Sequence, residues 1–372
     1  RKCPYCDFAS EAHEVIPEQP YLEALLREMA LWRHRYPHDE RPLISIYLGG
    51  GTPSLMRPQS VARLLSVIGE LWPLAADCEI SMEVNPESAT PERLAGYRQA
   101  GMNRISLGIQ ALDERRLKSL QRPHDLATAR RVMGWVRQQG FERFGLDLIF
   151  ATPGHTPELW HQELEEALAA QPDHLSCYAL TLEPGTPFHR RMEAGDLQLP
   201  DEEMGLALFQ QTRQVLTAAG YPPYEISNFA PPSGRCRHNV NYWAFGDYLG
   251  FGAGAHGKWS DGGGAVWRMD HSEGVRGYLK AVEQGKPWRA KRLSSQDAAS
   301  ECVMMGLRMQ EGMHRATYAG YAGEDLTARW PEETARFVEM GLLALEDSHI
   351  RLTPEGVLLA DGIMAEFLEG GA

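Results

Sequence analysis

Short runs of apolar and β-branched residues alternate, over the first 228 positions, with longer stretches whose apolar residues recur at helical spacing. This alternation predicts parallel strands joined by covering helices. The expected strands are Leu43–Leu48, Glu79–Val84, Arg104–Leu107, Gly145–Phe150, His174–Leu180 and Tyr224–Ile226. The expected helices are Pro20–Arg35, Pro58–Leu71, Pro91–Ala100, Leu126–Gln139, Pro157–Ala169 and Asp201–Ala219.

Residues that typically begin and end helices support this assignment. Several of the expected helices begin with Pro or Asp in the first turn, and two end at Gly140 and Gly220. Repeated strand–helix units without a Rossmann-type glycine turn favour a partial or full (β/α) barrel, which is an α/β fold, over an open doubly wound sheet. In such a barrel the chemistry lies at the carboxyl ends of the strands.

The alternation stops near residue 228, which divides the chain into three expected regions. Residues 1–228 are expected to form the barrel core, residues 229–289 a connecting region, and residues 290–372 a small helical end domain. The segment Leu352–Gly356 predicts a strand, a turn and the start of a last helix. This order is typical of a winged-helix-like domain.

Composition and charge exclude some classes of partner. The 372 residues are 43% hydrophobic and 23% charged, as in ordinary globular proteins. The net charge of −13 argues against binding along a nucleic-acid backbone, which needs basic patches. No apolar run approaches the roughly 18 residues of a membrane span. Six cysteines are too sparse for a disulfide scaffold, so we expect a reducing, cytoplasmic setting, with Cys78, Cys177 and Cys302 as small core residues.

A closely spaced pair of thiols opens the chain. Cys3-Pro4-Tyr5-Cys6 fits three kinds of site: a thiol–disulfide exchange pair, half of a zinc site, or part of an iron–sulfur ligand set. No second C-x-x-C follows to complete a zinc site. The pair alone does not decide between the other two.

A glycine run follows the first expected strand. Gly49-Gly50-Gly51-Thr52 removes side chains where another group must approach the backbone closely, and its N–H groups can bind an anionic group. A tight strand-to-helix turn is the alternative. The run is not a P-loop, because no Gly-Lys-Ser/Thr follows it.

Polar residues recur where the next strands end. Glu83 and Asn85 close one strand, Gln110 closes the next, and Asp147 lies inside an apolar strand, where a carboxylate needs a partner or a ligand. Their position on one barrel rim favours a site over separate structural roles. Arg122, in a loop, is either a solvated charge or a clamp for a carboxylate.

A second cluster of chemically capable residues lies at His238-Asn239-Val240-Asn241-Tyr242-Trp243, in an expected loop. Histidine can ligate haem iron, and aromatic rings can stack on a porphyrin. Cys236 is a rival ligand, and His256 is a further candidate. The alternative is a packed loop with a hydrogen-bonded histidine.

Taken in order, these motifs resemble radical S-adenosylmethionine (SAM) proteins of the anaerobic coproporphyrinogen oxidase class. The resemblance rests on Cys3-Pro4-Tyr5-Cys6-Asp7-Phe8, on the Gly49–Pro53 run, and on the strands that carry Glu83, Gln110 and Asp147. It spans nearly the whole chain and implies a partial (β/α) barrel of the radical SAM type. The H-N-x-x-Y-W pattern of His238–Trp243 is similar to the signature of the haem chaperone (HemW-type) branch.

The resemblance also implies a set of cofactor ligands. The family's cluster motif is C-x-x-x-C-x-x-C, and Cys3 and Cys6 match its second and third cysteines. The remaining cysteine of a 4Fe–4S cluster and the first barrel strand are expected upstream of Arg1, so the chain as numbered is expected to lack a complete cluster. By position, SAM next to the cluster would be contacted by Tyr5, Gly50 and Glu83. The resemblance implies further cofactor contacts at Gly51, Thr52, Gln110, Arg122 and Asp147. These positions match ones that bind cofactor in the coproporphyrinogen dehydrogenases of this class, partly at a second SAM molecule.

The function implied by the resemblance is that of a haem chaperone, which binds haem and transfers it to a recipient protein. His238 is the expected haem ligand, with Tyr242 and Trp243 beside it. The alternative is an oxygen-independent coproporphyrinogen III oxidase-like enzyme of porphyrin biosynthesis. Those dehydrogenases carry a further cysteine where Phe8 stands, which favours the chaperone branch. A glutaredoxin-like thiol exchanger is a third hypothesis, and it gives no role to the glycine run or to His238–Trp243.

Overall fold

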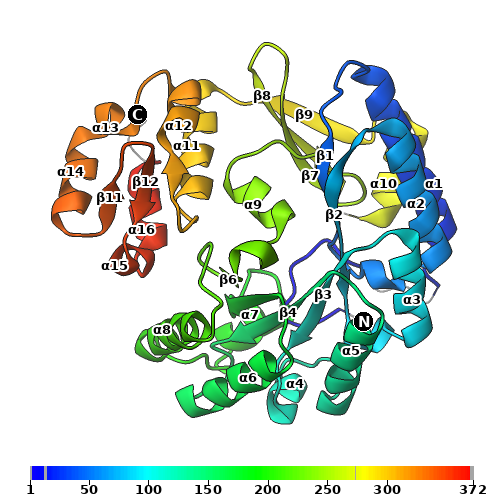
Figure 1. Cartoon of the computed structure of the whole chain (residues 1–372), viewed down its shortest axis with the longest axis horizontal. Coiled ribbons are helices and arrows are strands. Elements are labelled where there is room, and N and C mark those ends of the chain that lie inside the picture. The colour runs from blue at the N-terminus through cyan, green and yellow to red at the C-terminus, as the bar shows by residue number, and fades with distance from the viewer. Residues whose placement is uncertain (1, 12–14, 273, 369–372) are drawn as a thin grey trace.

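The computed structural model describes residues 2–11, 15–272 and 274–368. Within these ranges the strands form one six-stranded sheet and two three-stranded sheets (Figure 1). The large sheet contains β1 (Leu43–Leu48), β2 (Leu74–Val84), β3 (Arg104–Gln110), β4 (Arg143–Phe150), β5 (His174–Ala179) and β6 (Asn228–Phe229), in that spatial order. Strands β1 to β5 are parallel, and β6 is antiparallel to β5. This sequential order is that of a partial barrel and confirms the expected fold class.

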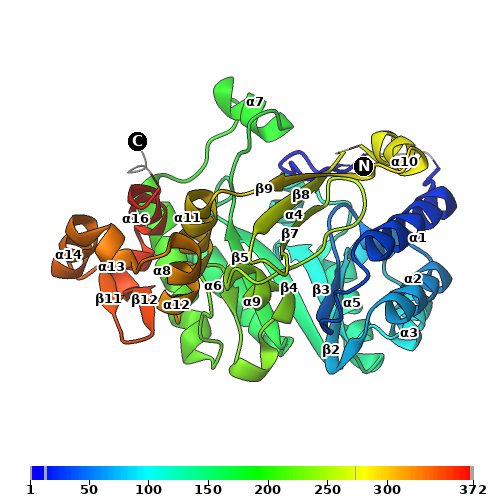
Figure 2. The same ribbon diagram turned by 90° about the horizontal axis from the view of Figure 1, so that it is seen from above.

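The helices of the barrel lie mainly on the outer side of this sheet (Figures 1 and 2). They are α1 (Glu18–Arg35), α2 (Pro58–Leu71), α3 (Pro91–Ala100), α4 (Glu114–Ser119), α5 (Leu126–Gln138), α6 (Pro157–Ala169), α7 (Pro187–Glu193) and α8 (Glu202–Ala218). The bounds of α2, α3 and α6 are those predicted, whereas the short helices α4 and α7 were not predicted. Local chemistry explains the agreement: Thr90 caps α3 by accepting from the Arg93 N–H at 3.2 Å, and Gly101 ends it in the left-handed region at φ +111°.

One expected strand was wrong. Residues Tyr224–Ile226 form a bend, and the strand lies two residues later, at β6. The cause is the buried carboxylate of Glu225, which accepts hydrogen bonds from the Ser227 N–H at 2.7 Å and from the Asn228 side chain at 2.6 Å. These local bonds hold the backbone in a turn at the point where the apolar pattern indicated an extended segment.

The two faces of the parallel sheet differ in chemistry. One face carries apolar side chains, such as Ile105, Leu107, Leu146 and Leu148, that are buried in the main core beneath the helices. The opposite face lines the barrel interior, which we call the lumen, and it is almost entirely polar because side chains alternate along each strand. The lumen residues include Ser45, Tyr47, Glu79, Ser81, Glu83, Arg104, Ser106, Gly108, Gln110, Asp147, His174, Ser176 and Tyr178, together with Gly145 and the apolar Ile149.

The region expected to connect the barrel with the end domain contains regular structure that the sequence did not reveal. Its elements are α9 (Arg237–Trp243), β7 (His256–Ser260), β8 (Val266–His271), α10 (Val275–Glu283) and β9 (Trp288–Arg292). The three strands form an antiparallel sheet in the order β7-β8-β9. The motif His238–Trp243, expected in a loop, therefore lies on a helix, which is a correction to the sequence analysis.

The last part of the chain packs around a core of its own. Its elements are α11 (Ser295–Gly306), β10 (Met313–His314), α12 (Arg315–Ala322), α13 (Leu326–Arg329), α14 (Pro331–Glu339), β11 (Leu343–Leu345), β12 (His349–Leu352), α15 (Pro354–Val357) and α16 (Ala360–Glu366). The expected strand–turn–helix is present, because Thr353 follows β12 and caps α15 by accepting from the Gly356 N–H. The placement of the domain boundaries stays a prediction. In the described ranges, no helix combines the length and the apolar character that crossing a membrane requires.

Candidate cofactor and haem site

The loop that carries the two expected cluster cysteines is tied to the barrel by its backbone. The Cys6 N–H donates to the Cys3 carbonyl at 3.2 Å, so the two thiols lie on one turn. The Pro4 carbonyl accepts from the Phe188 N–H of α7 at 3.0 Å, and the Tyr5 ring lies 6.2 Å from the Phe188 ring. The unpredicted helix α7 thus supports this loop. Both thiols are partly exposed, and burial raises the pKa of Cys6.

Arg122 joins the cysteine loop to the rim of the sheet. Its guanidinium lies 3.4 Å from the Cys3 sulfur and donates to the Asn85 side chain at 2.8 Å and to the Gly108 carbonyl at 3.0 Å. Only 5% of the side chain is exposed, so Arg122 is not a solvated charge. A Cβ at Gly108 would lie 2.8 Å from the Asn85 oxygen, so this contact network requires glycine there.

Glu83 is the central acid of the lumen. Its carboxylate accepts from the Tyr47 hydroxyl at 2.9 Å and from the Gly50 N–H at 3.1 Å. Burial, with the nearby charge of Asp147 as the second cause, raises the pKa of Glu83 to about 7. Gly50 reaches this position with φ +106°, a conformation that suits glycine. The glycine run therefore carries a backbone N–H to a lumen carboxylate.

The other predicted cofactor residues lie around the same rim. The Asp147 carboxylate accepts from the Ser106 hydroxyl at 3.0 Å, and burial raises its pKa. Thr52 accepts from the Asn85 side chain at 3.5 Å. Gln110 ends β3 with φ +70°. A Cβ on Gly51 would lie 3.3 Å from that of Ser10, so the glycine run passes close to the cysteine loop.

Helix α9 carries the H-N-x-x-Y-W motif between the barrel and the C-terminal core. On the barrel side, the His238 ring stacks on the Tyr47 ring, with 4.5 Å between centroids and an interplanar angle of 16°. On the other side, Tyr242 and Trp243 pack against the C-terminal core, and Arg308 lies 4.5 Å from the centre of the Trp243 ring. The three residues predicted to bind haem thus share helix α9. His238 faces the barrel, whereas Tyr242 and Trp243 face the C-terminal core.

The two rival haem ligands differ in protonation. Burial raises the pKa of the Cys236 thiol to about 12, next to the carboxylate of Glu79, so this sulfur stays protonated at neutral pH. Burial lowers the pKa of His238, which keeps its imidazole neutral with a lone pair to offer. In the part of the chain that the structure describes, the His238 nitrogens have no hydrogen-bond partner, and the side chain is partly exposed. His256, the further candidate, is exposed at the start of β7.

Known proteins are similar to this chain in sequence and in fold. Residues 1–167 match the model of the radical SAM superfamily, and residues 293–359 match that of the HemN C-terminal domain. The haem chaperone HemW of Escherichia coli is 36% identical over 372 residues, which cover 99% of this chain and 95% of the relative. The chain belongs to the HemW family of radical SAM proteins. HemW of Haemophilus influenzae is 38% identical over 326 residues, 87% of this chain and 83% of that relative.

The fold of this HemW family member is also that of a solved enzyme structure. The coproporphyrinogen III oxidase HemN of Escherichia coli superposes with a TM-score of 0.83 and 24% identity, over 99% of this chain and 87% of that one. At this level of identity the comparison concerns the fold alone. It agrees with the six-stranded partial barrel and the helical C-terminal region.

Membership of the radical SAM superfamily implies a 4Fe–4S cluster and SAM, and the described residues fit these groups in part. The cysteine loop offers two thiols, the lumen offers the Glu83 carboxylate, and Arg122 joins the cysteine loop to the rim of the sheet. However, no group of three or more His, Cys, Asp or Glu side chains that could hold a metal ion occurs among residues 2–11, 15–272 and 274–368. The described cysteine loop therefore supplies two thiolates toward such a cluster.

Sequence reasoning missed Tyr47, which contacts both the lumen acid Glu83 and the motif residue His238. The available signal was a tyrosine two residues before the glycine run, in a strand whose other side chains are mostly aliphatic.

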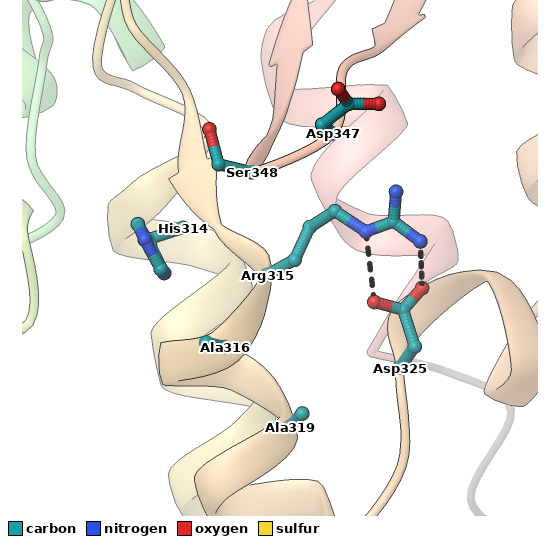
Figure 3. A pocket seen from close by; sticks show the side chains of 7 residues that line it. All are labelled: His314, Arg315, Ala316, Ala319, Asp325, Asp347 and Ser348. Carbon is teal, nitrogen blue, oxygen red and sulfur yellow. Dashed lines mark hydrogen bonds and ion pairs between the residues drawn. The ribbon is translucent and has the colours of Figure 1, made fainter.

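A cavity of about 500 Å³ lies apart from this site, in the C-terminal region (Figure 3). Arg315 and Asp325 face each other in it and form a bidentate ion pair with distances of 2.9 and 3.0 Å. His314 and Ser348 also line it. Because the arginine is already satisfied by Asp325, the cavity offers no free charge of either sign from this pair.

Proposed function

We propose that this protein is a haem chaperone, which binds haem next to helix α9 and transfers it to a recipient protein. The observation that carries the proposal is that the His238 imidazole is neutral and has no hydrogen-bond partner among the described residues. His238 also belongs to a motif that lies between the barrel and the C-terminal core. The relatives that are named haem chaperones, aligned over nearly the whole chain, support it. Tyr242 and Trp243 would support the helix from the C-terminal side.

The cofactor residues have separable roles in this proposal. Cys3 and Cys6 would hold two irons of the cluster, and Arg122 would fix the loop that presents them. Tyr5, Gly50 and Glu83 would bind the SAM next to the cluster, where Glu83 accepts from the cofactor's amino group and Gly50 permits close backbone approach. When bound, the reduced cluster would supply the electron that breaks a carbon–sulfur bond of SAM. Further contacts to SAM would come from Gly51, Thr52, Gln110, Arg122 and Asp147.

The lumen residues would act by binding, orienting and holding protons. Glu83, with a pKa near 7, becomes fully ionised when an ammonium group lies against it, because a cation favours the charged carboxylate. Asp147 accepts from the Ser106 hydroxyl, and although burial raises its pKa, a cationic ligand nearby would favour its ionised form.

The setting we propose is the cytoplasm, with haem and an unidentified haem-accepting protein as partners. All six cysteines are unpaired thiols, which fits a reducing compartment. The acidic net charge of −13 gives no support to a nucleic-acid partner.

The test is a haemin titration followed by the Soret band. We expect saturation near one haem per chain in the wild type and a clear loss of affinity in His238→Ala. His256→Ala is the matched control, because His256 is exposed and lies outside the motif; it is expected to bind like the wild type. A Cys236→Ala variant that binds like the wild type would support His238 as the ligand.

The absence of a saturable shift in the wild type would refute the chaperone proposal. Product formation from coproporphyrinogen would then favour the oxidase-like alternative. A loss of haemin affinity in Cys236→Ala but not in His238→Ala would identify the Cys236 sulfur as the haem ligand.

A further inference from the structure

Tyr47 is held from three sides by residues of two different sites. Its hydroxyl donates to Glu83 at 2.9 Å, and its ring face stacks on His238 at 4.5 Å. On a third side lies Gly49, where an added Cβ would be only 2.6 Å from the Tyr47 ring and 2.9 Å from the Glu83 carboxylate. The missing side chain at Gly49 therefore makes the room in which this tyrosine lies.

These contacts form a short, continuous path across the lumen. At one end is Glu83, whose other oxygen accepts from the Gly50 N–H. At the other end is His238, on the seven-residue helix α9. Tyr47 touches both ends, and its ring is rigid, so a displacement of the hydroxyl must move the face on which the imidazole rests.

We propose that Tyr47 is a positioning residue that couples the two sites: occupation of the Glu83 pocket by SAM fixes the Tyr47 ring and thereby tightens the binding of haem at His238. This inference rests on the proposed function, because it needs haem to bind at His238. Coupling of this kind is reciprocal, so bound haem must tighten SAM binding by the same factor.

The physical argument is one of preorganisation. A cationic amino group beside Glu83 keeps the carboxylate ionised, and an ionised carboxylate accepts a stronger hydrogen bond from the tyrosine hydroxyl than a protonated one. The anchored ring then holds the imidazole in one orientation before haem arrives, so less side-chain freedom is lost on binding. The raised pKa of Glu83 supports this order of events. Part of the Glu83 population is still protonated near neutral pH, and a bound cation would ionise it.

The experiment measures haemin affinity with and without saturating SAM in matched variants of the full chain. In the wild type we expect SAM to tighten haem binding by about fivefold or more. Tyr47→Phe keeps the ring but loses the hydroxyl, and we expect the effect of SAM to disappear. Tyr47→Leu loses the ring as well, and we expect weaker haem binding even without SAM, by about two- to tenfold. Tyr178→Phe, another lumen tyrosine, is the control and should keep the SAM effect.

The outcomes separate this inference from the proposed function. A haem affinity in the wild type that does not respond to SAM overturns the coupling. A Tyr47→Phe variant that keeps the full SAM effect removes Tyr47 from it, as does a Tyr178→Phe variant that loses the effect equally. Haem binding that is insensitive to His238→Ala instead refutes the proposed haem site itself.

Discussion

The guanidinium of Arg104 lies 3.2 Å from the carboxylate of Glu79 at the amino-terminal end of the lumen, and both side chains are at most 4% exposed. Arg104 also donates to the Gly234 carbonyl at 2.9 Å, and Glu79 accepts from the Arg237 N–H at 2.8 Å. A buried ion pair inside the sheet thus fixes the first turn of α9, the helix that carries His238.

We expect Arg104→Met to destabilise the protein strongly, because it leaves the Glu79 charge buried without its partner. Such losses are typically about 3–5 kcal/mol, measurable by urea unfolding. The control is Arg63→Met, which breaks a pair with Glu23 whose two members are each about half exposed, and should cost about 1 kcal/mol or less. Equal losses in the two variants would contradict this account of the lumen pair.

A side chain at Gly49 should disturb both proposed sites at once. In Gly49→Ala the new methyl group collides with Tyr47 and Glu83, and overpacking of this kind costs about 1–3 kcal/mol. We expect lower stability together with weaker haemin binding. Gly69→Ala is the matched control, because a Cβ there meets nothing within 4 Å and the site lies on helix α2. Normal haemin affinity in Gly49→Ala would show that Tyr47 can move without consequence.

Removing the arginine beside Cys3 should weaken the hold on iron. Groups that orient metal ligands commonly contribute 10- to 100-fold in metal affinity. After reconstitution with iron, we therefore expect Arg122→Gln to lose its iron at about 10- to 100-fold lower chelator concentrations than the wild type. Iron per chain is the readout. Arg130→Gln, which breaks an exposed pair with Glu166, is the control and should behave like the wild type. Equal retention in all three proteins would contradict the role given to Arg122.

The stability of the protein should fall as pH rises above neutral, because of His271. Its Nδ1 lies 2.8 Å from the Ala255 carbonyl and its Nε2 lies against the Glu28 carboxylate, so only the doubly protonated ring donates to both. Burial opposes this charge, but the hydrogen bond and charge of Glu28 outweigh it and raise the pKa above 6.5. The contribution is therefore fully present below the ordinary histidine pKa of about 6.5 and is lost as pH rises through the higher value in the folded protein.

The measurement for this pH effect is urea unfolding of the wild type and of His271→Gln between about pH 6 and about pH 9. We expect a difference of about 3 kcal/mol at the acidic end that shrinks toward the basic end. His161→Gln, at an exposed position of α6, is the control. A difference between the wild type and His271→Gln that grows with pH would have the wrong sign for an imidazolium–carboxylate pair.

Much of the barrel was predictable because its signals are local. Pro58, Pro91 and Pro157 begin helices whose ends agree with the prediction, since proline is tolerated in the first turn and a capping residue precedes two of them. The residues Glu83, Gln110 and Asp147 were placed on one rim from the strand order alone, and the structure brings them to neighbouring strands of the lumen.

The remaining features depend on contacts between distant residues. Helix α9 begins where the Arg237 N–H meets Glu79, 158 positions earlier, and no pattern within the motif itself reveals this partner. Strands β7 to β9 were not predicted, and they are stabilised by Trp259 and Trp267, whose rings stack at 5.9 Å across the sheet. The stacking of Tyr47 on His238 is of the same long-range kind.

Helix α9 has one further consequence. Its first half rests on the barrel through His238, and its last residue, Trp243, rests on Arg308 of the C-terminal core. The seven residues of this helix thus contact both cores, and the hydrogen bond from the Gln310 N–H to the Tyr224 carbonyl joins the same two regions. We therefore expect a recipient protein that binds the C-terminal region to affect the position of His238 through this helix, even where it makes no contact with the barrel.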